Sequence, residues 1–376
     1  MVIFHHPRPL DPDPAVASSL RPMRMCEAFR ELGEEVVEVA GDGDDRIRMA
    51  SHLEQRLASC CEVDGAVLYG ESVIVPPALT WLRKNPLRLN SDYKFLKRIH
   101  DRGIPTGVFY RDIHWILARE KAFKLRALVR NFLTPFFARQ ELQFYRRFLD
   151  VLFLPHENMA EYLPVDFPGA LISSLPPGGE IREPVGRGGR ERGPGVLRMI
   201  YVGNIAPPIY DLRPYISGID ASGCAELTLV TRPRALRNYA DLYGFANKPR
   251  IKPMEGHGKL LDPLYAEADI ALTALGECDY LSFAMPVKVF EAVSFGIPQI
   301  VSGGLTVAAE LIEKENLGWV VKDAEELVLL LQRLASHPEE IAAKRESVVR
   351  AQERHTWQAR ARSALTTLRR SAGREG

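Results

Sequence analysis

The chain has 376 residues, of which 46% are apolar, and its 49 Lys and Arg nearly balance its 48 Asp and Glu. This length is about two and a half times that of a typical domain, so we expect two domains. The composition excludes a disordered chain. The balanced charge argues against a nucleic-acid partner.

The five cysteines are odd in number and scattered, without Cys or Cys/His pairs at zinc-ligand spacing. Neither a disulfide framework nor a structural metal is therefore expected. No apolar run approaches the ~18 residues of a membrane span, and the N-terminus lacks the pattern of a signal peptide. We expect a cytoplasmic protein.

Short apolar runs rich in β-branched residues predict six strands in the first half of the chain. Helical periodicity lies between them, for example over 22–32 and 49–60. Strands and helices that alternate in this way favour a parallel sheet covered on both faces. The predicted strands are Val2–Phe4, Val36–Ala40, Gly65–Tyr69, Thr106–Tyr110, Val151–Leu154 and Leu171–Ser173.

The alternation stops at 176–195, PPGGEIREPVGRGGRERGPG, where breakers and charges predict a linker or exposed loop. It then restarts, which predicts an N-terminal domain over 1–178, a linker over 179–195 and a second α/β domain over 196–350. The second set of predicted strands is Leu197–Val202, Glu226–Val230, Arg250–Lys252, Asp269–Leu275, Gln299–Val301 and Gly318–Val320.

In open α/β sheets, ligands lie beyond the carboxyl ends of the strands. Two such sheets facing each other would form a cleft between the domains, which is a favoured place for a site. We therefore looked for chemistry-bearing residues that directly follow the predicted strands.

The most informative stretch is 279–304, DYLSFAMPVKVFEAVSFGIPQIVSGG. Met285 and Pro286 close a loop, and a helix is predicted to begin directly after them. Lys288 then falls in the first turn, where backbone N–H groups and the helix dipole favour an anion such as a diphosphate. Glu291 lies on the same face and could accept hydrogen bonds from two ribose hydroxyls. The alternative is an ordinary surface helix with an i, i+3 ion pair.

The segment MPVKVFEAVSFGIPQIV resembles the nucleotide-sugar signature of GT-B glycosyltransferases, in particular family 4-like bacterial enzymes. Their signature is a P-x-K-x-[FL]-E segment followed by G-x-P and a strand. The resemblance implies that Lys288 meets the donor diphosphate, that Glu291 meets the ribose and that Met285 lies beside the donor. It also implies the GT-B fold, an α/β architecture of two Rossmann-like domains that face one cleft.

Further segments resemble the same enzymes in the expected order. Gly203 and Asn204 follow the first strand of the second half, where these enzymes place a glycine-containing loop beside the donor. The run 264–272, LYAEADIAL, resembles a run that precedes their signature. Trp357 and the Arg-rich segment after it resemble their C-terminal helix, which implies that 351–376 crosses back to the first domain.

Two departures from the family pattern affect the sugar contacts. Phe283 occupies the position of a second glutamate that many of these enzymes carry near the transferred sugar. The loop after Gly203 has neither of the usual cations. Arg232, just past the next predicted strand, is the candidate substitute.

For the acceptor, the resemblance points to the end of the strand at 106–110. Asp112 is the candidate general base, or a residue that orients the sugar, and His114 is the second candidate. Alternatively, Asp112 pairs with Arg111 or caps the following helix. Ser18, Ser19 and Arg21 precede or open the first long helix and suit an acceptor or a phosphate, although a simple N-cap is an equal alternative.

Two D-x-D patterns, at 11–13 and 42–45, match a metal motif of another glycosyltransferase fold, but one sits among prolines and the other has the composition of a turn. No metal and no cofactor are therefore expected. Dinucleotide and Walker A motifs are absent from the sequence.

The run 119–149 carries eight Lys and Arg against two Glu, interleaved with aromatic residues. A basic amphipathic segment of this kind could lie on anionic lipid at the inner face of a membrane and bring the cleft to a membrane-held acceptor. The alternative is that its apolar face packs on its own domain.

Together these features predict a glycosyltransferase that moves a sugar from a nucleotide-diphosphate donor, expected to be UDP-linked, to a hydroxyl of an envelope polysaccharide, a lipid-linked saccharide or another glycan. Two alternatives remain open. One is a catalytically silent GT-B module that binds a donor or a partner, and the other is a nucleotide-sugar 2-epimerase.

Overall fold

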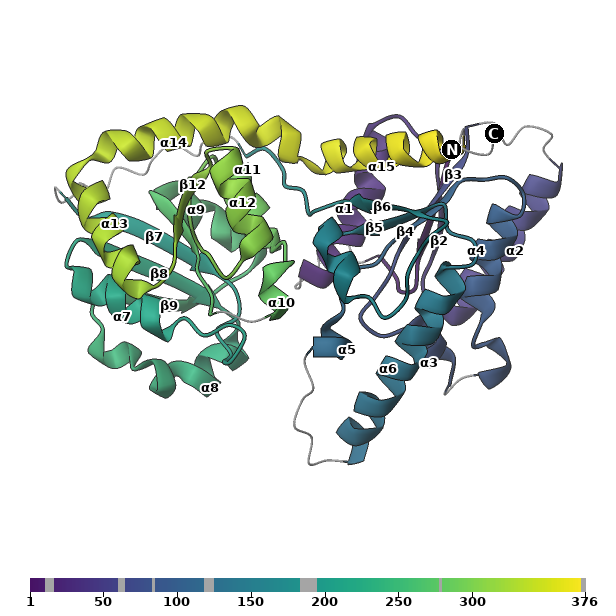
Figure 1. Cartoon of the computed structure of the whole chain (residues 1–376), viewed down its shortest axis with the longest axis horizontal. Helices are drawn as coiled ribbons and strands as arrows, with labels where there is room; N and C mark the ends of the chain where they lie inside the picture. The colour runs from purple at the N-terminus through teal and green to yellow at the C-terminus, as the bar shows by residue number, and fades with distance from the viewer. Residues whose placement is uncertain are drawn as a thin grey trace. The chain divides into compact units, whose positions relative to one another are not determined.

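The computed structural model describes residues 1–10, 17–59, 65–82, 85–117, 125–182, 195–276 and 279–372. The chain forms two compact units (Figure 1). The first comprises Met1–Pro176 with Trp357–Gly376, and the second comprises Pro177–Thr356. The division into 1–178, 179–195, 196–350 and 351–376 stays a prediction, and residues 183–194 of the predicted linker lie outside the described part.

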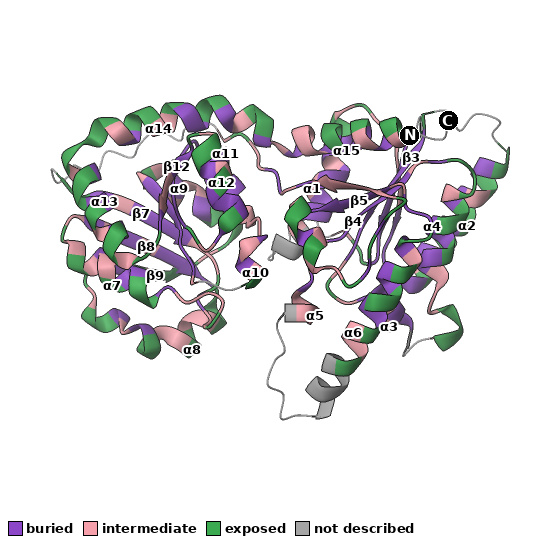
Figure 2. Cartoon of the chain, viewed as in Figure 1, coloured by how far each residue is buried: buried purple, intermediate pink, exposed green. Residues whose placement is uncertain are grey.

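The first unit is built on a six-stranded parallel sheet in the order β2-β1-β3-β4-β5-β6. Its interior strands are buried on both faces, which is why they read as short continuous apolar runs (Figure 2). The strands are β1 (Val2–His6), β2 (Val36–Ala40), β3 (Val67–Glu71), β4 (Thr106–Phe109), β5 (Val151–Leu154) and β6 (Leu171–Ser174).

Helices α1 (Ala17–Glu31) and α15 (Trp357–Ser371) pack against one face of this sheet. Their side chains share a core with Phe4 of β1 and Tyr69 of β3. Successive strand residues point to opposite faces, so His5 faces the other side, where α2 (Gly43–Ser59) and α4 (Ser91–His100) lie. The remaining helices of this unit are α3 (Pro77–Leu82), α5 (His114–Leu117) and α6 (Leu125–Tyr145), with 3-10 turns at Pro86–Arg88 and Glu157–Tyr162.

The second unit has its own six-stranded parallel sheet, in the order β12-β11-β10-β7-β8-β9. Side chains of α7, α8, α12 and α13 join one large core cluster on one face, and α9 packs in a smaller cluster on the other. The strands are β7 (Leu197–Val202), β8 (Ala225–Thr231), β9 (Ile251–Glu255), β10 (Ile270–Thr273), β11 (Gln299–Ser302) and β12 (Gly318–Val321). The helices are α7 (Arg213–Ser222), α8 (Pro233–Tyr243), α9 (Asp262–Glu267), α10 (Asp279–Ser282), α11 (Val287–Ser294), α12 (Thr306–Lys314), α13 (Ala324–Ser336) and α14 (Pro338–Ala351).

The two parallel sheets confirm the fold class predicted from the alternating pattern, and each predicted strand overlaps an observed one, with ends that differ by a few residues. Two helix starts differ from the prediction. Helix α1 begins at Ala17, so Pro22 lies inside it, and α2 begins at Gly43. Among the described residues, no helix combines the length and apolarity that crossing a bilayer requires.

Candidate active site

The first turn of α11 carries Lys288, and no side chain caps this helix end. The Lys288 Nζ donates a hydrogen bond to the Tyr201 Oη at 3.1 Å and lies 4.3 Å from the centroid of that ring. Across the described part of the chain, Lys288 has no ion-pair partner. Burial lowers the pKa of Lys288 to about 7, although the nearby Glu291 charge opposes the shift. The amine is therefore poised to gain a proton beside an incoming anion.

Glu291 lies one turn further along α11. The Tyr265 hydroxyl donates to its Oε2 at 3.0 Å, and the Tyr265 ring stacks on Phe295 with centroids 4.5 Å apart. Burial raises the pKa of Glu291, while the Tyr265 hydrogen bond and the charges of Arg182 and Lys288 oppose that rise. Both are described residues, and no ion pair joins Lys288 to Glu291. Tyrosines therefore hold the two side chains, and the i, i+3 pair of the alternative interpretation does not form.

Gly203 directly follows β7 and, having no Cβ, lets the Lys288 side chain approach the loop closely. Its φ is +157°, and an added Cβ would come within 3.0 Å of both the Lys288 Nζ and the Tyr201 Oη. Asn204 shapes the loop, because its carbonyl accepts from the Tyr201 hydroxyl at 2.6 Å and its Oδ1 accepts from the Ile205 N–H at 2.9 Å. The structure thus brings Lys288, Glu291, Gly203 and Asn204 to one edge of the second sheet.

Three other residues of this unit bear on the donor prediction. Arg232 is exposed and occupies the N-cap position of α8. Met285 is half-buried against the main core. Phe283 is 3% exposed and packs edge-to-face on Tyr280. A buried benzyl side chain supplies no charge where family 4-like enzymes have a glutamate.

The acceptor candidates lie in the first unit, where Asp112 follows β4. Its Oδ1 accepts a hydrogen bond from the backbone N–H of His114 at 2.8 Å, which is the capping contact of the alternative interpretation. Both side chains are half-buried. The catalytic roles of Asp112 and His114 stay predictions.

Arg21 is buried in α1, and a carboxylate of the same unit compensates its positive charge. Its Nε donates to the Glu71 Oε1 at 3.0 Å, and its guanidinium lies 3.5 Å from the centroid of Phe109. The Tyr69 hydroxyl donates to the same Glu71 oxygen at 2.8 Å. Ser18 and Ser19 belong to the first turn of α1, but their side chains lie outside the described part of the chain. Acceptor binding by these three residues remains a prediction.

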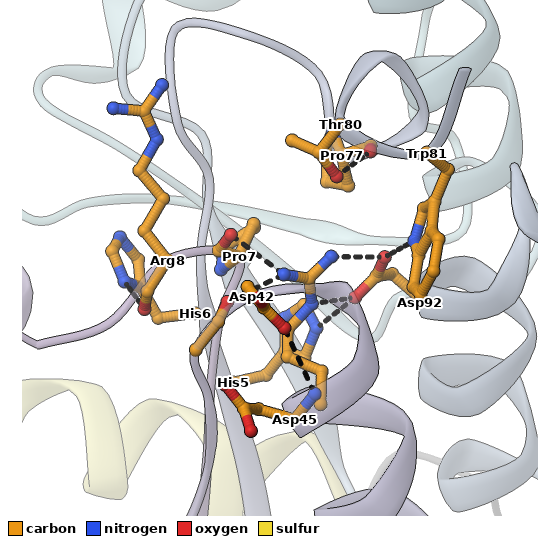
Figure 3. Close-up of polar contacts among 12 residues, drawn as sticks. His5, His6, Pro7, Arg8, Asp42, Asp45, Pro77, Thr80, Trp81 and Asp92 are labelled. Atoms are coloured by element: carbon orange, nitrogen blue, oxygen red, sulfur yellow. Dashed lines mark hydrogen bonds and ion pairs between the residues drawn. The ribbon is translucent and has the colours of Figure 1, made fainter. Parts of the chain in front are cut away.

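Sequence reasoning missed a buried charged network centred on Asp92 (Figure 3). Arg46 donates to both carboxylate oxygens, at 2.5 and 2.9 Å, and also to the carbonyls of Pro7 and Gly41. His5 and Trp81 contact the same carboxylate at 3.1 and 3.2 Å. Although burial opposes it, these hydrogen bonds hold the pKa of Asp92 well below its usual range. The network ties together the chain segments that follow β1 and β2.

Two further buried titratable groups of this unit were also missed. The His6 Nδ1 lies 2.8 Å from the Arg8 carbonyl, its Nε2 has no hydrogen-bond partner, and burial lowers its pKa to about 4. Glu141 accepts a hydrogen bond from the Tyr145 hydroxyl at 2.9 Å, and burial raises its pKa to about 8. The local sequence around His6 and Glu141 gave no signal for either buried environment.

The two D-x-D patterns bear on metal binding. The Asp42 Oδ1 accepts hydrogen bonds from the N–H groups of Asp44 and Asp45, as expected of a turn that opens α2. The pattern at 11–13 lies outside the described residues. Among those that are described, no three His, Cys, Asp or Glu side chains gather as a metal site would require.

The fold and helix α11, which carries the signature segment, define the class of protein. Two parallel Rossmann-like units are the GT-B glycosyltransferase fold. Residues 257–366, which include Lys288 and Glu291, match the family described as "Glycosyl transferase-like". These residues are therefore similar to glycosyltransferases in sequence as well as in fold.

Several solved structures are similar to this protein over nearly the whole length of the chain. The chain is similar to HepE of Anabaena in complex with UDP and glucose, with 13% identity, 98% of this chain and 100% of that chain covered, and a TM-score of 0.60. It is also similar to sucrose-phosphate synthase of Thermosynechococcus elongatus, with 15% identity, 98% of each chain covered and a TM-score of 0.58. WaaG, a glycosyltransferase involved in lipopolysaccharide biosynthesis, matches with 16% identity, 98% and 99% coverage and a TM-score of 0.54. No curated protein sequence matches the chain.

Proposed function

We propose that the protein is a glycosyltransferase that takes a sugar from a UDP-linked donor bound at the edge of the second sheet. The observation that carries this proposal is the arrangement around α11, in which Lys288 has no ion-pair partner among the described residues and lies against Gly203 at the end of β7. Glu291, one turn away, is positioned by Tyr265 to receive ribose hydroxyls. UDP is favoured because HepE is described in complex with UDP and glucose, and a trehalose-6-phosphate enzyme of E. coli with UDP-2-fluoro glucose.

In this proposal, Lys288 and backbone N–H groups stabilise the negative charge that develops on the leaving diphosphate. Electrostatic stabilisation of this kind is usually the largest single contribution to catalysis. The lowered pKa of Lys288 fits the role, because the amine becomes fully charged only when the diphosphate arrives. Asp112 is the proposed base toward the acceptor hydroxyl, and Asn204 and Arg232 are proposed donor contacts.

The donor proposal is tested by thermal unfolding with UDP, GDP, ADP and CMP. A nucleotide at about 100 times its dissociation constant adds roughly 2.7 kcal/mol of stability. We expect UDP to stabilise the wild type and to have no effect on Lys288→Ala or Glu291→Ala. Lys314→Ala and Glu325→Ala remove exposed charges from the same unit and should keep the response. A wild type that responds to none of the four nucleotides would overturn the proposal.

Phe283 favours one second candidate, a GT-B module that binds the donor without turnover. The buried phenyl ring supplies no carboxylate near the transferred sugar. Release of UDP from UDP-sugars with a panel of acceptors, lost in Asp112→Asn, would exclude this candidate. UDP binding without turnover across the panel would favour it.

For the acceptor we propose an envelope glycan or a lipid-linked saccharide, reached through the basic segment 119–149. Side chains up to 131 lie outside the described part, but beyond them Phe132 and Phe136 of α6 are 75% and 49% exposed. Aromatic side chains beside arginines suit an anionic lipid surface. Co-sedimentation with vesicles containing phosphatidylglycerol should fall in Phe132→Ser/Phe136→Ser. Binding that is unchanged in this variant would contradict the membrane role.

A further inference from the structure

The strand next to Gly203 ends in a buried hydroxyl that has no hydrogen-bond partner. Thr231, the last residue of β8, is 3% exposed, and its Oγ1 is unsatisfied. A buried hydroxyl without a partner costs roughly 1–3 kcal/mol. Such a group in a native protein calls for a functional reason, because a valine of the same shape would avoid that cost.

The register of the sheet places Thr231 beside Gly203. Val202 pairs with Val230, and the Gly203 N–H continues this ladder by donating to the Val230 carbonyl at 3.0 Å. Gly203 and Thr231 are therefore neighbours across the two strands. An added Cβ on Gly203 would come within 3.0 Å of the Lys288 Nζ, so Thr231 belongs to the same edge of the sheet as Lys288.

The hydroxyl also faces the side of the sheet on which α8 lies. Thr231 has the parity of Leu227 and Leu229, which point into the main core cluster. Leu236 and Tyr239 of α8 pack against that same cluster. Helix α8 begins directly after β8 (Figure 1), so Thr231 and the first turn of α8 are neighbours in the chain.

The beginning of α8 is positively charged and uncapped. Pro233 occupies the first helical position and no side chain caps the turn, so the N–H groups of Arg234 and Ala235 remain available. Arg232 and Arg234 are exposed, and within the described ranges neither forms an ion pair. Oriented N–H groups together with guanidinium groups form a site for a phosphate.

We propose that Thr231, the first turn of α8 and the side chains of Arg232 and Arg234 form a phosphate-binding subsite beside Lys288, which holds the diphosphate of the donor. This inference rests on the proposed nucleotide-sugar function and deepens it. The loop after Gly203 has no cation in 205–211, where family 4-like enzymes carry two. The proposed subsite supplies positive charge for the diphosphate in their place. The second positive charge on the diphosphate then comes from the neighbouring strand.

The test measures UDP and inorganic pyrophosphate binding by titration calorimetry, together with the melting temperature of each ligand-free variant. Thr231→Val should keep or raise the melting temperature, because the unsatisfied hydroxyl is removed, and should weaken UDP binding about tenfold. Arg232→Ala/Arg234→Ala should weaken both ligands at least about tenfold. A residue with a merely structural role would not combine retained stability with lost affinity.

Two matched controls come from the same elements. Thr228→Val lies on β8 with the opposite parity, and it should leave binding unchanged. Arg237→Ala removes an equally exposed charge from α8 beyond its first turn, where the influence of the helix terminus has faded. Its effect on binding should be smaller than that of either variant of the subsite.

The outcomes separate this inference from the donor proposal. If UDP binds to Thr231→Val and to Arg232→Ala/Arg234→Ala as it does to the wild type, while Lys288→Ala fails to bind it, the subsite is wrong and the donor site stands. If pyrophosphate binds through Thr231 but no nucleotide binds, the subsite stands and the nucleotide-sugar function falls. If neither ligand binds to the wild type, both are wrong. A Thr231→Val protein with a markedly lower melting temperature would show that the hydroxyl supports the fold.

Discussion

Partly or fully buried charged side chains near the carboxyl edges of the two sheets differ in whether they have a counter-charge. In the first unit, Arg21 pairs with Glu71 and Arg46 pairs with Asp92, and all four side chains are buried. In the second, the contacts of the Lys288 amine within the described residues are with the hydroxyl and the ring of Tyr201. A buried charge that has a counter-charge is already stabilised in the folded protein. A cation without a counter-charge is stabilised when an anion binds. The contrast separates charges that stabilise the first unit from a cation that we propose binds the donor.

The largest expected effect comes from breaking a satisfied pair. Asp92→Ala leaves Arg46 buried without its counter-charge and should lower the free energy of unfolding by about 3–5 kcal/mol. Denaturant unfolding measures this change. The control is Asp101→Ala at the C-terminal end of the same helix, which removes an exposed i, i+4 pair with Lys97 and should cost about 0.5 kcal/mol or less. Equal losses in the two variants would show that the Asp92 network does not stabilise the first unit.

Glu141 is the buried carboxyl of the first unit that lacks a cation, so it should behave unlike Asp92. Its pKa in the folded protein is raised to about 8, so the folded state holds a proton that the unfolded state releases between about pH 4.5 and 8. Stability from this group therefore falls as pH rises through that window. Glu141→Gln should be more stable than the wild type at pH 8 and similar to it at pH 5. Melting curves that differ equally at both pH values would contradict this account.

Lys288 offers the corresponding variant in the second unit. Its pKa in the folded protein is lowered to about 7, so the charged form is disfavoured in the folded state, and stability rises with pH between about 7 and 10.5. Lys288→Met should therefore be more stable than the wild type at pH 6, by a margin that shrinks towards pH 10, and should not bind UDP. A variant that is less stable than the wild type at pH 6 would place Lys288 among the satisfied charges.

The smallest expected effect is on affinity. In the proposed donor site UDP binds the charged form of Lys288, so its association constant should fall by up to about tenfold for each pH unit above 7. Binding at pH 8 should also take up a proton, which appears in calorimetry as a heat that depends on the ionisation enthalpy of the buffer. The same heat in phosphate and Tris buffers would show that Lys288 is already charged in the empty site.

The arrangement of strands and the signature helix could be predicted from the sequence, because both depend on local patterns. Apolar β-branched runs predict the buried strands, and Pro286 followed by Lys288 predicts a helix start with a cation. Partners of buried charges depend on tertiary pairing across many residues, so they could not be predicted. Arg21 meets Glu71, 50 positions away, and was interpreted as an acceptor contact.

The remaining predictions were limited because the same local sequence is compatible with two different roles. Asp112 has the sequence context of both a catalytic base and a helix cap, and only the hydrogen bond from His114 shows that it caps. Thr231 gave no signal at all, since a threonine at the end of a strand is ordinary. What marks it is the absence of a hydrogen-bond partner, which only three-dimensional packing reveals.

The low pKa of Lys288 has a further consequence, in chemical reactivity. A lysine with a pKa of about 7 is about half unprotonated at neutral pH and can act as a nucleophile, whereas ordinary lysines are protected by their charge. A mild acylating reagent at pH 7.5 should therefore label Lys288 ahead of exposed lysines such as Lys314. A bound diphosphate would restore the proton and suppress the labelling. We therefore expect the labelling of Lys288 to report whether the proposed donor site is occupied.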